Sequence, residues 1–150
     1  MAERTELNVL NDLLDVCRDG EHGFGFAAAH ATNPDVRALF TTLSDERHRF
    51  AEELSPHVRR LGGQAATDGT TAAAVHRRWM QLKQNMSSRP DDVLLVEAKR
   101  GEEAAMQAYR AALTGQLPPT AIELIKEQYH RVCEAHRRML ALEEMLVAES

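Results

Sequence analysis

Apolar residues recur along most of the chain at alternating spacings of three and four residues, with polar residues between them. This period places the apolar side chains on one face of an α-helix. The pattern predicts helices over residues 6–31, 34–61, 72–86, 91–113 and 120–147. Proline or glycine separates successive segments, because proline disfavours a helical residue before it and glycine readily follows the last helical turn. These breaks are Asn33-Pro34, Gly62-Gly63, Ser87-Ser88-Arg89-Pro90 and Pro118-Pro119.

Four of the predicted helices are long, and the short one, residues 72–86, lies between the second and third long helices. A helix rises about 1.5 Å per residue, so a connection of roughly 25 to 30 residues can span a bundle. The helix that follows could then run parallel to the second, as in ferritin-like bundles with one long crossover. We therefore expect an all-α fold, a single ferritin-like four-helix bundle over residues 1–150 with an additional short crossover helix. A five-helix up-and-down bundle is the alternative.

Each long helix carries one ionisable residue near the middle of its apolar face. On residues 34–61, for example, this face passes from Leu43 through Glu46 to Phe50. A polar residue on an apolar face is more informative than an exposed apolar one. With a rise of about 1.5 Å per residue in the ferritin-like arrangement, all four residues fall within roughly one turn of the same height. We expect one polar layer, made of Glu21, Glu46, Glu102 and His136.

This layer has the composition of a metal site. Carboxylates and histidines in the middle of a helical bundle hold the metal in di-iron and di-manganese proteins. Oxygen and imidazole ligands suit iron, manganese or zinc, so the layer predicts a site for such an ion. The alternative is a metal-free network, in which Arg49 and His136 neutralise the glutamates and the layer only fixes the fold. An arginine can bind two carboxylates through its planar guanidinium group.

Several short motifs are spread over nearly the whole chain. They are Asp19-Gly20-Glu21-His22-Gly23-Phe24, Glu46-Arg47 with Phe50, Arg60-Leu61-Gly62-Gly63, His76 with Trp79-Met80, Arg100-Gly101-Glu102 with Tyr109, and Ala135-His136. Together they resemble a bacterial family of uncharacterised ferritin-like four-helix-bundle proteins, distantly similar to rubrerythrin. The resemblance implies a ferritin-like fold and names no reaction. Compared with the rubrerythrin-like di-iron pattern, about four of the six ligand positions match. Arg49 and Cys133 stand at the other two, which weakens the case for a two-metal site.

Two further motifs have the spacing of a Glu-x-x-His ligand pair. In Glu127-x-x-His130, Tyr129 occupies the inward position of the helix. Glu127 and His130 therefore face the flank of the bundle or solvent. The Asp45-x-x-His48 motif is turned away from the core in the same manner. We expect neither motif to bind metal.

The two cysteines lie one helical turn from members of the polar layer, Cys17 from Glu21 and Cys133 from His136. In the ferritin-like arrangement their helices run parallel, so both thiols could lie in that layer. There they could supplement the metal site or form a redox pair. The alternative is that each is a small buried apolar residue.

Charge and composition limit the partners and the cellular compartment that we expect. The net charge of -5 argues against nucleic acid as a partner. No apolar run is long enough for a membrane span, so we expect no membrane contact. The two cysteines form no C-x-x-C motif, which fits a reducing compartment. We therefore expect a cytoplasmic protein.

Two functional hypotheses remain. The preferred one is a transition-metal site, for iron, manganese or zinc, acting in stress response or metal metabolism. The alternative is a metal-free structural or protein-interaction bundle. Apolar residues on the short helix would favour a homo-oligomer in either case. No motif supports an enzyme that acts on an organic substrate.

Overall fold

The computed structural model describes residues 2–64, 69–84, 86 and 89–149. Over these residues the secondary structure consists of helices, namely α1 (Ala2–His30), α2 (Pro34–Arg60), α3 (Gly69–Gln84), α4 (Pro90–Leu113) and α5 (Pro119–Glu149). Each overlaps one helix predicted from the sequence, and the all-α prediction is confirmed. Within the described part of the chain, no helix has the length and continuous apolar character needed to cross a membrane.

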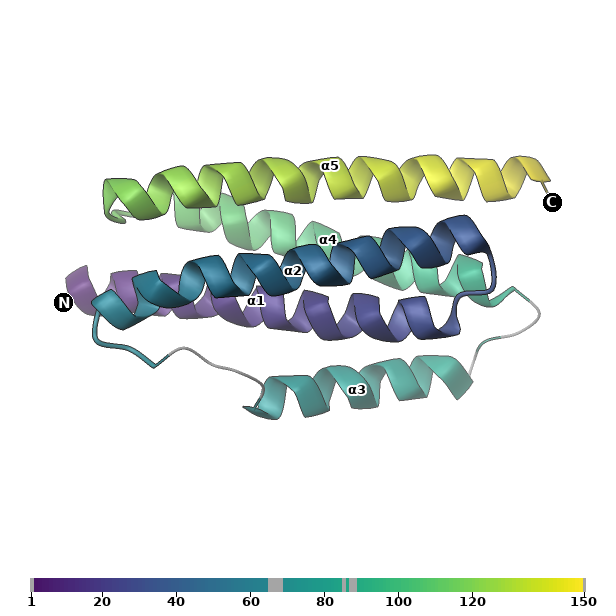
Figure 1. The fold of residues 1–150 in the computed structure, drawn as a ribbon, viewed down its shortest axis with the longest axis horizontal. Helices are drawn as coiled ribbons and strands as arrows, with labels where there is room; N and C mark the ends of the chain where they lie inside the picture. Colours follow the sequence, from purple (N-terminus) through teal and green to yellow (C-terminus); the bar gives the residue numbers. More distant parts are fainter. Residues whose placement is uncertain (1, 65–68, 85, 87–88, 150) are drawn as a thin grey trace.

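The four long helices pack into a bundle, and α3 lies outside it. Helix α1 packs against α2 and α4, and α5 packs against the same two helices. Helix α3 packs against α1. Figure 1 shows α1, α3 and α5 running in one direction and α2 and α4 in the other. The chain therefore returns along the length of the bundle through α3 before α4 begins.

The start and end of α2 follow from local chemistry. The Asn33 side chain accepts hydrogen bonds from the backbone N–H groups of Asp35, at 2.8 Å, and Val36, at 3.3 Å. This N-cap satisfies donors that have no partner within the helix. After the helix, Gly62 adopts a positive φ of 85°, a conformation that glycine reaches without a steric penalty.

One carboxylate joins the α1–α2 turn to the start of α4. The buried Asp91 side chain accepts hydrogen bonds from the backbone N–H groups of Thr32, at 2.8 Å, and Asn33, at 2.7 Å. The Thr32 hydroxyl donates a third bond, at 3.1 Å. This contact fixes where α4 begins relative to α1 and α2.

The apolar core falls into two clusters along the bundle axis. One contains buried residues from positions 10–17, 50–58, 105–112 and 125–132. The other contains buried residues from positions 24–31, 36–43, 79, 94–98 and 135–139. Between the clusters lies a level where charged side chains enter the bundle. The predicted positions Glu21, Glu46 and Glu102 fall between the clusters on their helices, and His136 lies beside the break on α5.

Candidate functional site

A buried ion pair between α2 and α4 occupies the level between the two apolar clusters. Arg47 and Glu102 are each only 1% exposed. The guanidinium Nη1 donates to Glu102 Oε1 at 2.7 Å, and Nη2 donates to Oε2. Burial alone would lower the pKa of Arg47, but the Glu102 carboxylate outweighs it and raises that pKa overall. Arg47 therefore keeps its charge inside the core and binds the carboxylate in the two-bond geometry typical of strong arginine–carboxylate pairs.

One glycine and two aromatic residues surround the Arg47 side chain. A Cβ atom at Gly20 would lie 3.1 Å from Arg47 Cγ, so the arginine side chain fills the space that a larger residue would need. The guanidinium carbon lies 5.2 Å from the ring centroid of Phe24 and 5.8 Å from that of Phe50. These distances allow cation–π attraction on both sides.

A chain of hydrogen bonds runs beside the ion pair and joins all four long helices. The Tyr109 hydroxyl donates to Gln128 Oε1 at 2.7 Å, and the Cys17 thiol lies 3.2 Å from that hydroxyl and donates to it. Gln128 Nε2 then donates to the backbone oxygen of Phe50 at 3.3 Å and to Glu53 Oε1 at 3.1 Å. Burial raises the pKa of Cys17 to about 11 and that of Tyr109 well above its usual value, so both stay protonated at neutral pH.

The four residues predicted to form one layer have separate partners. Glu21 accepts a hydrogen bond from Arg18 at 3.1 Å and lies 2.9 Å from His48 Nδ1. Glu102 is bound to Arg47. Only Glu102 is fully buried, since the side chains of Glu21, Glu46 and His136 are 24%, 14% and 19% exposed.

The other two predicted residues also pair with neighbours. Glu46 Oε2 lies 3.7 Å from Arg131 Nη1, and burial raises the pKa of Glu46. His136 Nε2 lies 3.4 Å from Glu103 Oε1. In the described part of the chain, no three histidine, cysteine, aspartate or glutamate side chains form a group that could hold a metal ion. This donor arrangement does not fit a bundle metal centre, and metal binding stays a prediction.

The arginine in the network is Arg47, whereas the sequence pointed to Arg49. Arg49 is exposed on α2. Leu43 and Phe50 are seven residues apart, and a helical face can join them through position 46 or position 47. Both positions carry a charged residue, so spacing alone could not decide between them.

The buried face of α5 differs from the predicted one at two positions near the polar level, each by one residue. Gln128 and Ala135 are buried, while Tyr129 and His136 are half-buried. The sequence analysis therefore missed Gln128, whose only early signal was its seven-residue spacing from Ala135.

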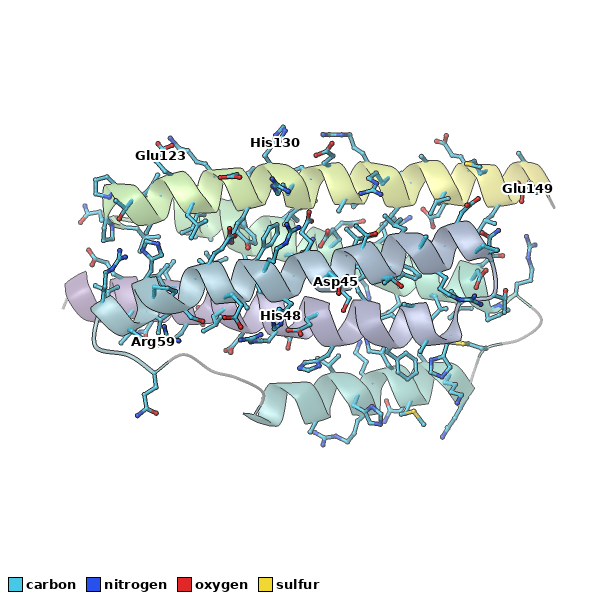
Figure 2. All side chains as sticks on the ribbon, in the orientation of Figure 1. Asp45, His48, Arg59, Glu123, His130 and Glu149 are labelled. Atoms are coloured by element: carbon cyan, nitrogen blue, oxygen red, sulfur yellow. The ribbon has the colours of Figure 1, made fainter. Side chains whose placement is uncertain are left out.

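The two motifs expected to face away from the core do so. Glu127 and His130 are exposed on α5, and Asp45 and His48 are exposed on α2. Figure 2 labels His130, Asp45 and His48 on these helices. Cys133 is half-buried, and both cysteines are free thiols.

Comparison with known proteins assigns the chain to a family. No curated protein matches the chain significantly. Residues 5–115 match the model of a family described as "Domain of unknown function (DUF2383)". This range contains Cys17, Arg47, Glu102 and Tyr109, whereas Gln128 and His136 lie beyond it. Because the match covers well over half of the chain, the protein belongs to the DUF2383 family.

Proposed function

We propose that the protein is a metal-free, ferritin-like helical bundle that serves as a structural or interaction module, in which the buried polar residues fix the fold. The observation that carries this proposal is the Arg47–Glu102 pair, whose two hydrogen bonds occupy both oxygens of the one glutamate that is fully buried among the described residues. The direction of α2 and α4, with α3 between them in the chain, supports the ferritin-like topology (Figure 1).

The charge balance of the core favours a structural role. Arg47 neutralises Glu102, and a metal ion at this carboxylate would meet the fixed positive charge of the guanidinium group. Releasing Glu102 to a metal would leave Arg47 buried without its partner, which costs about 3–5 kcal/mol in comparable pairs. The pair is therefore better suited to holding α2 against α4 than to exchanging ligands.

The Cys17–Tyr109–Gln128 chain supports the same role. Its hydrogen bonds form only when all four long helices hold their present rotation and height. Any other register would leave buried polar groups without partners, which costs about 1–3 kcal/mol each. Buried polar networks of this kind select one packing arrangement over alternatives.

The competing hypothesis is an iron, manganese or zinc site at Glu21, Glu46, Glu102 and His136, with a role in stress response or metal metabolism. It requires these side chains to leave the partners described above and to converge. Partial burial of Glu46 and His136 at the level between the apolar clusters is the feature on which it rests.

Elemental analysis separates the two hypotheses. The full chain is purified without chelators, and a second sample is loaded anaerobically with iron(II), manganese(II) or zinc(II). We expect less than stoichiometric metal in both, with no difference among the parent, Glu102→Ala and an exposed control, Glu144→Ala. About one tightly bound ion per parent chain, lost in Glu102→Ala and in His136→Ala but kept in the control, would disprove the proposal.

A further inference from the structure

A cleft of about 630 Å³ lies between α1 and α3, next to the close approach of Trp79 to Gly23. Helix α1 contributes Phe26 to its walls, and α3 contributes Ala73, Val75 and Trp79. Small-molecule sites in proteins usually have volumes of roughly 300–1,000 Å³. The cleft is therefore large enough for an organic ligand.

Aromatic side chains form one wall of this cleft. The ring centroid of Phe26 lies 5.4 Å from that of Trp79 and 6.4 Å from that of His76. Trp79 is buried, Phe26 is half-buried and His76 is exposed, so the aromatic wall runs from the core to the surface. A ligand can therefore reach the rings of Phe26 and His76, and a flat ring is the shape that packs best against them.

The charge of the lining distinguishes this cleft from the adjacent cavity among α1, α3 and α4. Among the described residues, the lining of the cleft contains His22, His76 and Arg77 and no carboxylate, although the chain has a net charge of -5. Asp19, which interacts with His22, lines the adjacent cavity instead, as does Glu97. An anion can therefore enter the cleft without meeting a carboxylate in its lining.

Arg77 is the cation best suited to bind such an anion. It is exposed and forms no ion pair with the other described residues, whereas Nη2 of its neighbour Arg78 lies 2.6 Å from Glu97 Oε1. A guanidinium group binds a carboxylate through two parallel N–H groups. His76, one residue before Arg77, keeps one N–H donor even when its ring is neutral. Donors for an anionic group therefore lie beside the aromatic wall.

We propose that this cleft binds a planar aromatic carboxylate of one or two fused rings. Its ring packs against Phe26 and His76, and its carboxylate accepts hydrogen bonds from Arg77. Because solvent reaches all three side chains, the ligand contacts them without rearranging the core. This inference goes beyond the structural role proposed above and does not depend on metal content. Absence of binding would leave the metal-free proposal standing.

Two adjacent alanines provide a matched test of the cleft. Ala73 and Ala74 are both exposed on α3, but only Ala73 lines the cleft. Ala73→Leu therefore narrows the cleft, and Ala74→Leu adds the same side chain outside it. Arg77→Gln removes the proposed carboxylate-binding cation. Lys83→Gln is its control, because Lys83 is exposed on the same helix and does not line the cleft.

Binding is measured on the full-length protein by calorimetry and by the NMR signal of the Trp79 indole N–H. Trp79 lines the cleft and is the only tryptophan of the chain, so this signal is unique. The probe is 2-naphthoate. For comparison, 2-naphthylmethanol lacks the charge, 2-naphthylmethylamine reverses it, and octanoate lacks the ring. We expect saturable binding of 2-naphthoate, about tenfold or more tighter than that of each comparison compound.

The variants test the proposed contacts, with circular dichroism confirming their helicity. Ala73→Leu and Arg77→Gln should each weaken 2-naphthoate binding about tenfold, whereas Ala74→Leu and Lys83→Gln should stay within about twofold of the parent. Absence of saturable 2-naphthoate binding would overturn the proposal. So would equally tight binding of any comparison compound, or equal binding of 2-naphthoate by the parent and either Ala73→Leu or Arg77→Gln.

Discussion

At the scale of single residues, the Arg47–Glu102 pair places two opposite charges where neither could stay alone. An isolated ion in an apolar interior loses its hydration without compensation, whereas a well-bonded pair recovers most of that loss. Removing one partner should therefore destabilise the fold more than removing both.

The first prediction concerns this asymmetry. Arg47→Leu leaves Glu102 buried and unpaired and should lower the free energy of unfolding by about 3–5 kcal/mol. The double variant Arg47→Leu/Glu102→Leu should recover a large part of that loss. Chemical denaturation of the two single variants and the double variant measures the coupling.

Arg49→Leu is the matched control, because Arg49 is exposed two residues further along α2. It should change the free energy of unfolding by no more than about 0.5 kcal/mol. A large effect at Arg49 together with a small one at Arg47 would contradict the assignment of the buried arginine.

Asp19 gives a prediction about pH. Burial, with a smaller contribution from Asp15, raises the pKa of Asp19 from 3.8 to about 6. The folded state therefore holds this proton more tightly than the unfolded state, so the contribution of Asp19 to stability falls as pH rises from about 4 to about 6. Asp19→Asn should be more stable than the parent at neutral pH, with an advantage that shrinks below pH 6 and vanishes near pH 4.

Urea denaturation at several pH values between about 4 and 7 tests this difference. Asp45→Asn removes one carboxylate from an exposed site on α2 and serves as the comparison (Figure 2). An Asp19→Asn advantage that stays constant over this range would show that the carboxyl group is not destabilised by burial.

At the scale of the helices, α3 differs from the other four because it packs mainly on one neighbour. Its attachment to α1 depends on close approach at Gly23, where a Cβ atom would lie 3.0 Å from Trp79 Nε1. Among the described residues, one ion pair, Arg78–Glu97, joins it to α4. The position of α3 therefore depends on the absence of a side chain in α1.

Gly23→Ala should loosen this contact. Alanine in a helix interior normally stabilises by about 0.5–1 kcal/mol relative to glycine, but here the added methyl group pushes against Trp79. We expect Gly23→Ala to shift tryptophan emission to longer wavelength and to lose that stabilisation. In the control, Gly25→Ala, the new Cβ atom would meet only Ser44 Oγ, at an ordinary contact distance of 3.4 Å, so stability should rise and emission should not change.

At the scale of the whole molecule, the sequence predicts the elements better than it predicts which charged residues are inside. Helix bounds follow from local signals such as Asn33 and Gly62, and Glu102, expected on the inward face of α4, is buried there. On α2 and α5, two adjacent positions satisfy the same helical period, and only the neighbouring helices select between them. A cavity of about 210 Å³ among α1, α3 and α4 could not be predicted, because it forms where side chains from separate helices fail to fill the same space.

The hydrogen-bond chain from Cys17 through Tyr109 to Gln128 has a consequence for how the protein unfolds. Because each bond crosses from one long helix to another, displacing any one of these helices breaks at least one bond of the chain. The long helices should therefore open as one cooperative unit. Helix α3 has no part in that chain, so its amide hydrogens can exchange with solvent through a separate, lower-energy opening that leaves the bundle intact.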